Sequence, residues 1–204
     1  MIESDGNVTH HHSTNQGHVT PEERAARYGQ QPVTVIFVGL SGAGKSTLAH
    51  GLERRLFDMG RVSTVLDGKG MRLGLSRDLG HDSAGRAENL RRSAHVARYL
   101  NESGLICCAA FVAASAEARA QAISVIGREN CILVYLNPSL EVCRRRDPSG
   151  LYAADATRPS GNVPGISFAY EAPDDADLVL DTGTISTAEC IDQVMGLLKT
   201  RKAL

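Results

Sequence analysis

Short apolar runs alternate along this chain with longer segments in which apolar residues recur at helical spacing. The apolar runs predict strands over residues 33–38, 62–66, 105–111, 131–136 and 177–181. The periodic segments predict helices over residues 45–59, 84–103, 116–127, 139–146 and 187–201. This alternation is typical of an α/β fold, a parallel sheet of about five strands with helices on both faces. Ligands of such sheets bind beyond the carboxyl ends of the strands, so the residues that follow each strand are candidates for a site.

Residues 1–31 are polar and are interrupted by glycine and proline, which predicts an N-terminal extension in front of a main domain over 32–204. Within the extension, Thr20-Pro21-Glu22-Glu23 fits the start of a helix, and we expect a short helix over 21–28. The triplet His10-His11-His12 lacks the i, i+4 spacing of a helical metal pair, so we interpret these histidines as surface residues.

The segment between the first strand and the first long helix fits the phosphate-binding pattern G-x-x-x-x-G-K-[ST]. It reads Gly39-Leu40-Ser41-Gly42-Ala43-Gly44-Lys45-Ser46-Thr47. Its glycines allow successive backbone N–H groups to point at phosphate oxygens, and the following helix N-terminus favours anions. Lys45 is expected to reach the β- and γ-phosphates, and the Ser46 hydroxyl to ligate Mg²⁺. The alternative is a glycine-rich turn without a ligand, but the context predicts a nucleoside triphosphate site and a P-loop NTPase fold.

Polar residues also follow the second predicted strand. Asp67 can hold Mg²⁺ or orient an acceptor hydroxyl, and Arg72 can bind an anion one turn later. The alternative for Asp67 is a structural Asp-Gly turn. Arg86 and Asn89 share one face of the helix over 84–103, where arginines are as often solvated as they are ligands.

A long irregular loop is predicted over residues 149–172, which are rich in glycine, proline, serine and alanine. It follows Arg144-Arg145-Arg146, a basic cluster that by itself indicates complementarity to a helix C-terminus. A kinase must keep water from the γ-phosphate, so we interpret the loop as a lid, with a disordered segment as the alternative.

Composition excludes several classes of protein. The 204 residues are 42% hydrophobic and 22% charged with a formal net charge of −1, which indicates a globular domain without a bulk nucleic-acid or membrane surface. The five cysteines show no CxxC spacing and are expected to be buried, reduced thiols. There is no signal-peptide pattern and no apolar run of membrane-spanning length. We therefore expect a cytoplasmic protein with neither a nucleic-acid nor a membrane partner.

Taken in order, these motifs resemble the adenylylsulfate (APS) kinase family, P-loop enzymes that phosphorylate the 3′-hydroxyl of adenosine 5′-phosphosulfate to give PAPS. The segment from Asn7-Val8 to Glu23-Arg24 also resembles the leader of that family. Beyond the phosphate loop, the matching pieces are Leu66-Asp67-Gly68 with Arg72, Asp78-Leu79-Gly80, Arg86 with Glu88-Asn89 and Arg91-Arg92, Gly104-Leu105 with Ala110-Phe111, Arg146-Asp147-Pro148, Gly150-Leu151-Tyr152 and Tyr170-Glu171-Ala172-Pro173.

The resemblance implies an adenylylsulfate kinase of sulfate assimilation that uses ATP and Mg²⁺, with Lys45 and Asp67 as catalytic residues. It implies that the substrate APS is held by Arg72, Arg86, Asn89 and Val112. It also implies that Arg146 packs on the adenine of ATP. A homodimer and an association or fusion with ATP sulfurylase are the partners that it suggests.

The sequence departs from the family pattern where APS is expected. Asp-Gly-Asp-Asn becomes Asp67-Gly68-Lys69-Gly70, so Lys69 replaces a candidate base for the 3′-hydroxyl. An aromatic residue becomes His81, and a serine becomes Ala113. In the lid, two lysines become Ala153-Ala154, and a phenylalanine expected to stack on the substrate adenine becomes Val163.

These departures leave three interpretations. The first is an APS kinase that lacks one base, because phosphoryl transfer depends mainly on positioning and electrostatics. The second is a P-loop kinase that acts on another small hydroxyl acceptor. The third is a catalytically impaired domain of the same fold that binds the nucleotide or APS and has a regulatory role.

Overall fold

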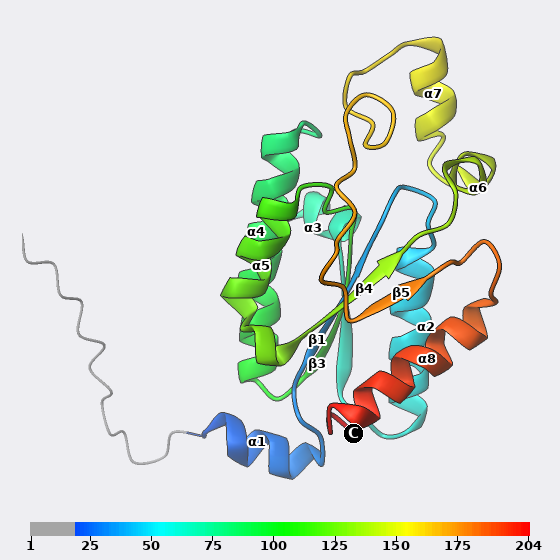
Figure 1. Cartoon of the computed structure of the whole chain (residues 1–204). Coiled ribbons are helices and arrows are strands. Elements are labelled where there is room, and N and C mark those ends of the chain that lie inside the picture. Colours follow the sequence, from blue (N-terminus) through cyan, green and yellow to red (C-terminus); the bar gives the residue numbers. More distant parts are fainter. Residues whose placement is uncertain (1–18) are drawn as a thin grey trace, which may run out of the picture.

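A five-stranded parallel sheet forms the centre of the chain (Figure 1), in a computed structural model that describes residues 19–204. The strand order is β2-β3-β1-β4-β5. The strands are β1 (Thr34–Val38), β2 (Ser63–Asp67), β3 (Ile106–Phe111), β4 (Cys131–Leu136) and β5 (Leu178–Leu180). The helices are α1 (Pro21–Tyr28), α2 (Lys45–Asp58), α3 (Gly68–Leu73), α4 (Ser83–Glu102), α5 (Ala116–Ile126), α6 (Leu140–Arg146), α7 (Leu151–Thr157) and α8 (Thr187–Thr200), with a 3-10 turn η1 (Arg128–Asn130).

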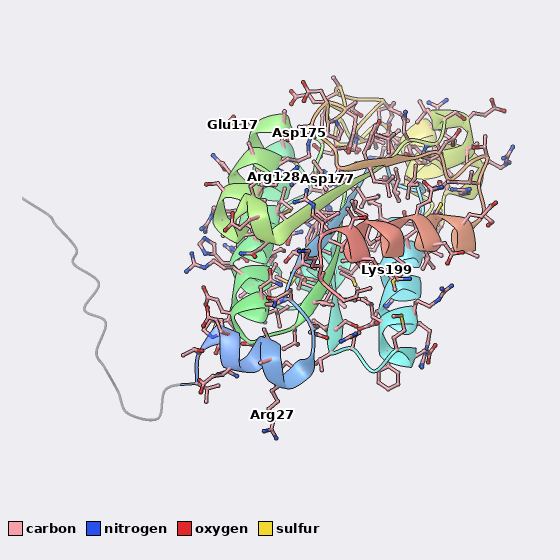
Figure 2. The ribbon with its side chains drawn as sticks, turned by 60° about the horizontal axis from the view of Figure 1, so that its bottom comes forward. Arg27, Glu117, Arg128, Asp175, Asp177 and Lys199 are labelled. Atoms are coloured by element: carbon pink, nitrogen blue, oxygen red, sulfur yellow. The ribbon has the colours of Figure 1, made fainter. Side chains whose placement is uncertain are left out.

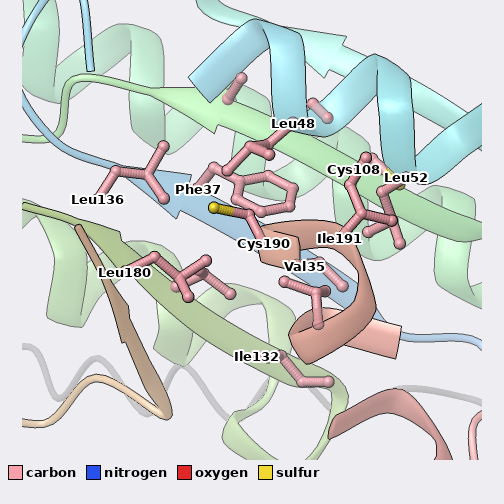
Figure 3. Packing of buried hydrophobic residues seen from close by; sticks show 14 of the residues in the cluster. Val35, Phe37, Leu48, Leu52, Cys108, Ile132, Leu136, Leu180, Cys190 and Ile191 are labelled. Atoms are coloured by element: carbon pink, nitrogen blue, oxygen red, sulfur yellow. The ribbon is translucent and has the colours of Figure 1, made fainter. Parts of the chain in front are cut away.

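The sheet has a separate hydrophobic core on each face because side chains alternate along each strand. On β1, Val35 and Phe37 point into the core beneath α2 and α8, whereas Ile36 and Val38 point into the core beneath α4 and α5. Figure 3 shows Phe37 packed among residues from α2 and α8. The predicted α/β fold is therefore confirmed, and every predicted strand and long helix lies within one residue of its expected bounds.

Two short helices are absent from the sequence prediction. The first is α3, whose N-cap is Asp67. The second is α7, so the prediction of an irregular loop over all of 149–172 is wrong. Helix α7 forms because the Asp147 carboxylate accepts hydrogen bonds from the backbone N–H groups of Tyr152 and Ala153, both at 3.0 Å, and so satisfies the first turn.

The segment at the N-terminal side of the domain is anchored by helix capping and by one buried glutamine. Thr20 and Glu23 form a capping box at the start of α1, which confirms the helix expected over 21–28. The Gln30 amide donates to the carbonyls of Val62 and Gly104 at 2.8 and 2.9 Å. His10-His11-His12 and most of the leader-like segment lie outside the described residues.

A cluster of charged side chains lies directly before β5 and is centred on Asp177. The Asp177 carboxylate is largely buried and accepts hydrogen bonds from Arg128, Arg201 and the backbone N–H of Leu133. Figure 2 shows Arg128 and Asp177 close together.

All five cysteines are free and buried, as expected. Burial raises the pKa of Cys107 and Cys131 to about 12, so these thiols are protonated at neutral pH. Across residues 19–204 no helix has the length and apolar character needed to cross a bilayer.

Candidate active site

The phosphate-binding pattern lies where the sequence predicts it, between the carboxyl end of β1 and the N-terminus of α2. Gly39 and Gly42 have φ angles of 145° and 79°, in the region that favours glycine. A Cβ atom on Gly39 would lie 2.5 Å from the Leu136 carbonyl oxygen, and one on Gly42 would lie 2.5 Å from the Cys143 carbonyl oxygen. Both glycines are therefore required by the close approach of neighbouring backbone.

Lys45 is buried at the first position of α2, and its Nζ donates to the Leu40 carbonyl at 2.6 Å. Burial lowers the pKa of Lys45 to about 8, and the nearby cations Lys69 and Arg86 act in the same direction. Cys143 and Asp67 act in the opposite direction. The Lys45 ammonium thus sits inside the loop with little compensating negative charge.

Ser46 and Asp67 bring two oxygen ligands together at the edge of the loop. The Ser46 hydroxyl donates a hydrogen bond to one oxygen of the Asp67 carboxylate. The other oxygen accepts from the backbone N–H of Lys69 at 2.7 Å, which caps α3. A hydroxyl and a carboxylate suit Mg²⁺, which usually takes one or two carboxylates and completes its shell with water and phosphate oxygens. The residues present therefore fit the cation that the motif implies.

Three predicted substrate residues lie on α3 and α4, across from the loop. The Arg72 guanidinium donates to the carbonyls of Leu79 and Gly80 at 3.0 and 2.8 Å. The Arg86 guanidinium donates to the carbonyls of His81 and Asn162 at 2.8 and 3.0 Å. Within residues 19–204 neither guanidinium forms an ion pair with a carboxylate. Both positive charges are thus held in place by carbonyls, and the nearby Asp82 carboxylate acts on both without pairing with either.

Asn89 is 5% exposed and lies one turn after Arg86 on α4. Its amide nitrogen donates to the Gly68 carbonyl at 3.4 Å, whereas its oxygen is buried without a hydrogen-bond partner within the described residues. Buried polar atoms are nearly always paired in folded proteins, so this oxygen is consistent with a ligand that donates to it.

These groups line one cavity of about 1220 Å³. The lining includes the cationic side chains Lys45, Lys69, Arg72, Arg86 and Arg146. Its only carboxylate within the described part of the chain is Asp67, which already bonds to Ser46 and to the start of α3. Such an excess of positive charge favours ligands that carry several negative charges.

Arg146 and Val112, for which the resemblance implies contacts with ATP and APS, also line the cavity. Arg146 lies at the end of α6 and donates to the Thr182 hydroxyl and carbonyl oxygens at 3.0 and 2.6 Å. The Thr182 hydroxyl in turn donates to the Ala43 carbonyl in the loop at 2.8 Å. Val112 follows β3, and its carbonyl accepts from the N–H of Gly39 at 3.5 Å.

The positions that depart from the family pattern do not share one environment. Lys69, His81, Ala113 and Ala154 line the cavity. Burial lowers the pKa of His81, and the neighbouring guanidinium groups of Arg72 and Arg86 lower it further. In contrast, Val163 is fully buried in the hydrophobic core beneath α2 and α8 and is not part of the cavity lining.

Sequence reasoning missed two residues that shape the loop. Tyr152 on α7 is 6% exposed and donates from its hydroxyl to the Ser41 carbonyl at 2.9 Å, so the lid segment is tied to the loop. The Thr182 hydroxyl donates to the Ala43 carbonyl and accepts from the Arg146 guanidinium. Thr182 follows β5, so the rule that sites form beyond strand ends could have identified it. Tyr152 stood within a recognised motif, but its partner is 111 residues away in sequence.

Comparisons with known proteins agree with this geometry. The family model described as adenylylsulphate kinase matches residues 31–181. The bifunctional enzyme CysN/CysC of Rhodopirellula baltica is 48% identical over 183 residues, which are 90% of this chain but 28% of that protein. The adenylyl-sulfate kinase of Shewanella pealeana is 40% identical over 191 residues, covering 94% of this chain and 89% of that protein. The structure of the Mycobacterium tuberculosis APS kinase CysC in complex with AMPPNP and APS is similar, with a TM-score of 0.80 and 39% identity over 83% of this chain and 99% of that chain.

Proposed function

The chain belongs to the adenylylsulphate kinase family, and from that premise we propose that it transfers the γ-phosphoryl group of ATP to the 3′-hydroxyl of APS, giving PAPS and ADP. One observation carries this proposal. The phosphate-binding loop and the three residues Arg72, Arg86 and Asn89 face a single cavity, so one nucleotide can lie on the loop while a second lies across from it. Both ligands are anionic, in agreement with the charge of the lining.

The donor side holds ATP. Backbone N–H groups of residues 39–47 and the N-terminus of α2 bind the phosphates. Lys45 gives up its bond to the Leu40 carbonyl and pairs with the β- and γ-phosphate oxygens, a better partner for a buried ammonium than a neutral carbonyl. Arg146, fixed by Thr182, packs on the adenine. Ser46 and Asp67 would hold Mg²⁺, which would supply positive charge to neutralise the phosphates.

The acceptor side holds APS. The guanidinium groups of Arg72 and Arg86 bind the phosphosulfate, and the unpaired Asn89 oxygen accepts a hydrogen bond from a ribose hydroxyl. Val112 forms the adjacent wall. These contacts orient the 3′-hydroxyl toward the γ-phosphate, and positioning together with electrostatic stabilisation is most of what a phosphoryl-transfer enzyme must provide.

The loss of the second carboxylate is compatible with turnover. General-base assistance is typically worth about 10²–10⁴-fold in rate, but the transition state of phosphoryl transfer is loose and carries its negative charge on the transferred group. Lys69 adds a cation to the cavity where a base is absent. The enzyme therefore relies on electrostatic stabilisation more than on proton removal, and the 3′-hydroxyl proton is lost late, to solvent or to a phosphate oxygen.

The segment over 149–172 acts as the lid. Tyr152 on α7 bonds to the phosphate-binding loop, and the Asn162 carbonyl in the second half of the lid accepts a hydrogen bond from Arg86. Closure over both ligands excludes water, so the γ-phosphoryl group reaches the 3′-hydroxyl in preference to a water molecule.

The decisive experiment is an assay of the purified chain with ATP, Mg²⁺ and APS. PAPS is expected to form, and Lys45→Ala is expected to abolish it. Formation of no PAPS above the Lys45→Ala background would contradict the proposal. Competition of APS against a panel of nucleotides and sugars tests the alternative of another hydroxyl acceptor.

A regulatory domain without turnover is a second candidate, favoured by Asp67 being the only carboxylate in the described lining of the cavity. In that case ADP and APS bind tightly, no PAPS forms, and the double substitution Lys69→Asp/Gly70→Asn restores activity. In the kinase proposal the wild-type chain already turns over.

The setting that we propose is sulfate assimilation in the cytoplasm, with a homodimer as the working unit and ATP sulfurylase as a physical partner or fused neighbour. The similarity to a bifunctional enzyme of which this chain spans 28% supports such a neighbour. Light scattering coupled to size exclusion would test the dimer, and a monomer at micromolar concentration would contradict it.

A further inference from the structure

A buried arginine without an acidic partner lies behind the acceptor side of the cavity. Arg119 on α5 is 5% exposed, and its guanidinium donates to the carbonyl of Ala113 at 2.8 Å. Within residues 19–204 it forms no ion pair with a carboxylate. Burial of an uncompensated cation costs free energy, and folded proteins rarely retain one without a specific use.

The carbonyl that Arg119 holds belongs to a strained residue. Ala113 has a φ angle of 47°, in the left-handed region that residues with a Cβ seldom adopt. Ala113 and the preceding Val112 line the cavity, and Val112 also accepts from Gly39 in the phosphate-binding loop. The strain therefore falls on the turn that forms the wall of the acceptor site, and strain of this kind persists only where the surroundings enforce it.

A second contact holds the same turn from the end of the lid. The backbone N–H of Glu171 donates to the Ala114 carbonyl at 3.0 Å, and the Glu171 carboxylate accepts from the N–H of Ala116 at 2.5 Å. The turn over 112–114 is thus held on one side by α5 and on the other by Glu171, near the end of the lid.

Two stacked tyrosines lie near Arg119. Tyr135 on β4 and Tyr170 are stacked, with ring centroids 6.0 Å apart and an angle of 10° between the planes. The Tyr170 hydroxyl is buried without a partner in the described part of the chain. Burial raises the pKa of both phenols, and Arg119 is close enough to oppose that rise. The Arg119 guanidinium therefore lies near both phenols as well as bonding to the turn.

We propose that Arg119 is a positioning residue, which acts through the Ala113 carbonyl to hold the Val112–Ala114 turn in the shape that the acceptor site requires. The proposal rests on the proposed function in one respect, that the acceptor site takes APS. Arg119 itself touches neither substrate. Removal of the Arg119 guanidinium lets Ala113 relax out of the left-handed region. This moves Val112 and changes the shape of the acceptor wall. The phosphate-binding loop keeps its conformation, because its own glycines and helix N-terminus hold it.

The test uses four variants of the full chain: Arg119→Met, Arg119→Lys, Ala113→Gly and the double variant Arg119→Met/Ala113→Gly. Arg119→Met is expected to raise the KM for APS about tenfold, equivalent to about 1.4 kcal/mol, with the KM for ATP changed less than about twofold. Arg119→Lys retains one hydrogen-bond donor, so its KM for APS is expected to lie between those of the wild type and Arg119→Met. Glycine adopts the left-handed conformation without strain, so the double variant is expected to recover most of the APS affinity.

Arg128→Met is the matched control, because Arg128 lies just beyond the other end of α5 and pairs with Asp177 away from the cavity. It is expected to lower the melting temperature without changing the ratio of the two KM values. If Arg119→Met changes both KM values together, or lowers stability alone as Arg128→Met does, or if the double variant shows no recovery, Arg119 has only a structural role and the proposal is wrong.

Amide hydrogen exchange of the ligand-free chain separates this proposal from the proposed function. Arg119→Met is expected to speed exchange over residues 112–116 while leaving residues 39–47 unchanged, whatever the acceptor is. If the wild-type chain makes no PAPS but the exchange changes as expected, the acceptor assignment fails and Arg119 keeps its role. Unchanged exchange over 112–116 would overturn that role.

Discussion

The Ser46 hydroxyl donates a hydrogen bond to the Asp67 carboxylate, which joins the first turn of α2 to the carboxyl end of β2. The same carboxylate caps α3, so its position is fixed from two sides. Because both residues stand at strand and helix ends on one edge of the sheet, their oxygens meet where the phosphates of a nucleotide on the loop are expected.

Asp67→Asn is therefore expected to raise the Mg²⁺ concentration needed for half-maximal activity by about ten- to a hundredfold, the usual effect of disturbing a metal's supporting oxygens. The amide oxygen can still cap α3, so the fold should survive. A titration of activity against Mg²⁺ at saturating ATP measures the change. Asp78→Asn, which alters a surface ion pair with Arg92, is the control and should leave the titration unchanged. An unaltered Mg²⁺ dependence in Asp67→Asn would remove Asp67 from the metal site.

The low pKa of Lys45 predicts a pH dependence of nucleotide binding. Its pKa in the folded, ligand-free chain is about 8, against 10.5 for an unperturbed lysine. Below about pH 8, the buried Lys45 ammonium therefore lowers the free energy of unfolding. This loss of stability disappears as the pH rises from 8 toward 10.5. Phosphate binding reverses the preference, because it stabilises the ammonium.

ADP affinity should accordingly fall as the pH rises above about 8, and binding at pH 8.5 should take up protons. Calorimetry in two buffers with different ionisation enthalpies measures the uptake. Lys45→Met should bind ADP weakly with no proton uptake attributable to this residue. Equal proton uptake in wild type and Lys45→Met would show that another group titrates.

Much of this architecture could be predicted because it depends on local patterns. The order of strands and helices follows from hydrophobic periodicity, and the loop over 39–47 follows from the conformations that only glycine adopts. Asp67 and Arg72 could be found because they follow a strand end at one edge of the sheet, whereas the roles of Arg86 and Asn89, on a helix, are implied by the family resemblance.

The remaining features depend on contacts that the pattern does not encode. The bond from Tyr152 to Ser41 spans 111 residues, and that from Thr182 to Ala43 spans 139. Helix α7 depends on the Asp147 carboxylate, which folds back onto its first turn. Whether a lid side chain faces the cavity or the core is set by tertiary packing, so the position of Val163 could not be read from its motif.

Removal of Lys69 is expected to shift the titration of Lys45. Lys69 lines the cavity and lowers the pKa of Lys45, so Lys69→Met should move the midpoint of the pH dependence of ADP binding upward. The same variant should lower kcat with APS, because it removes a cation from the site of developing negative charge. A pH series of ADP affinity and of kcat measures both effects. Lys199→Met, on the outer surface of α8, is the control. A midpoint that stays in place would mean that the two lysines do not interact.

The hydrogen bond from Tyr152 to Ser41 predicts that the lid limits the hydrolysis of ATP by water. Tyr152→Phe keeps the buried ring and removes one hydrogen bond, so we expect stability to fall by about 0.5–1.5 kcal/mol. The loosened lid should increase ATP hydrolysis in the absence of APS relative to PAPS formation. Chemical denaturation and the ratio of phosphate to PAPS released measure these effects. Tyr99→Phe, at an exposed ring on α4, should change neither.

Two substitutions toward the family's aromatic residues should have opposite outcomes, because the two positions face different environments. His81 lines the cavity, so a phenylalanine there can stack on a nucleobase. His81→Phe is expected to strengthen APS binding, and base stacking contributes about 1–3 kcal/mol where it has been measured by substitution. Calorimetric titration with APS measures the change, and ATP affinity serves as the internal control.

Val163 is fully buried in the core beneath α2 and α8, and its neighbours Asn162 and Pro164, not Val163 itself, line the cavity. Val163→Phe would force extra volume into a packed core, with an expected loss of about 1–3 kcal/mol of folding stability. APS affinity should stay the same or fall, because the added ring points away from the ligand. Denaturant unfolding and APS titration of Val163→Phe and Val163→Leu measure both quantities, with leucine as the smaller step in volume. A gain in APS affinity for Val163→Phe would mean that the lid segment turns this position into the cavity when substrate binds.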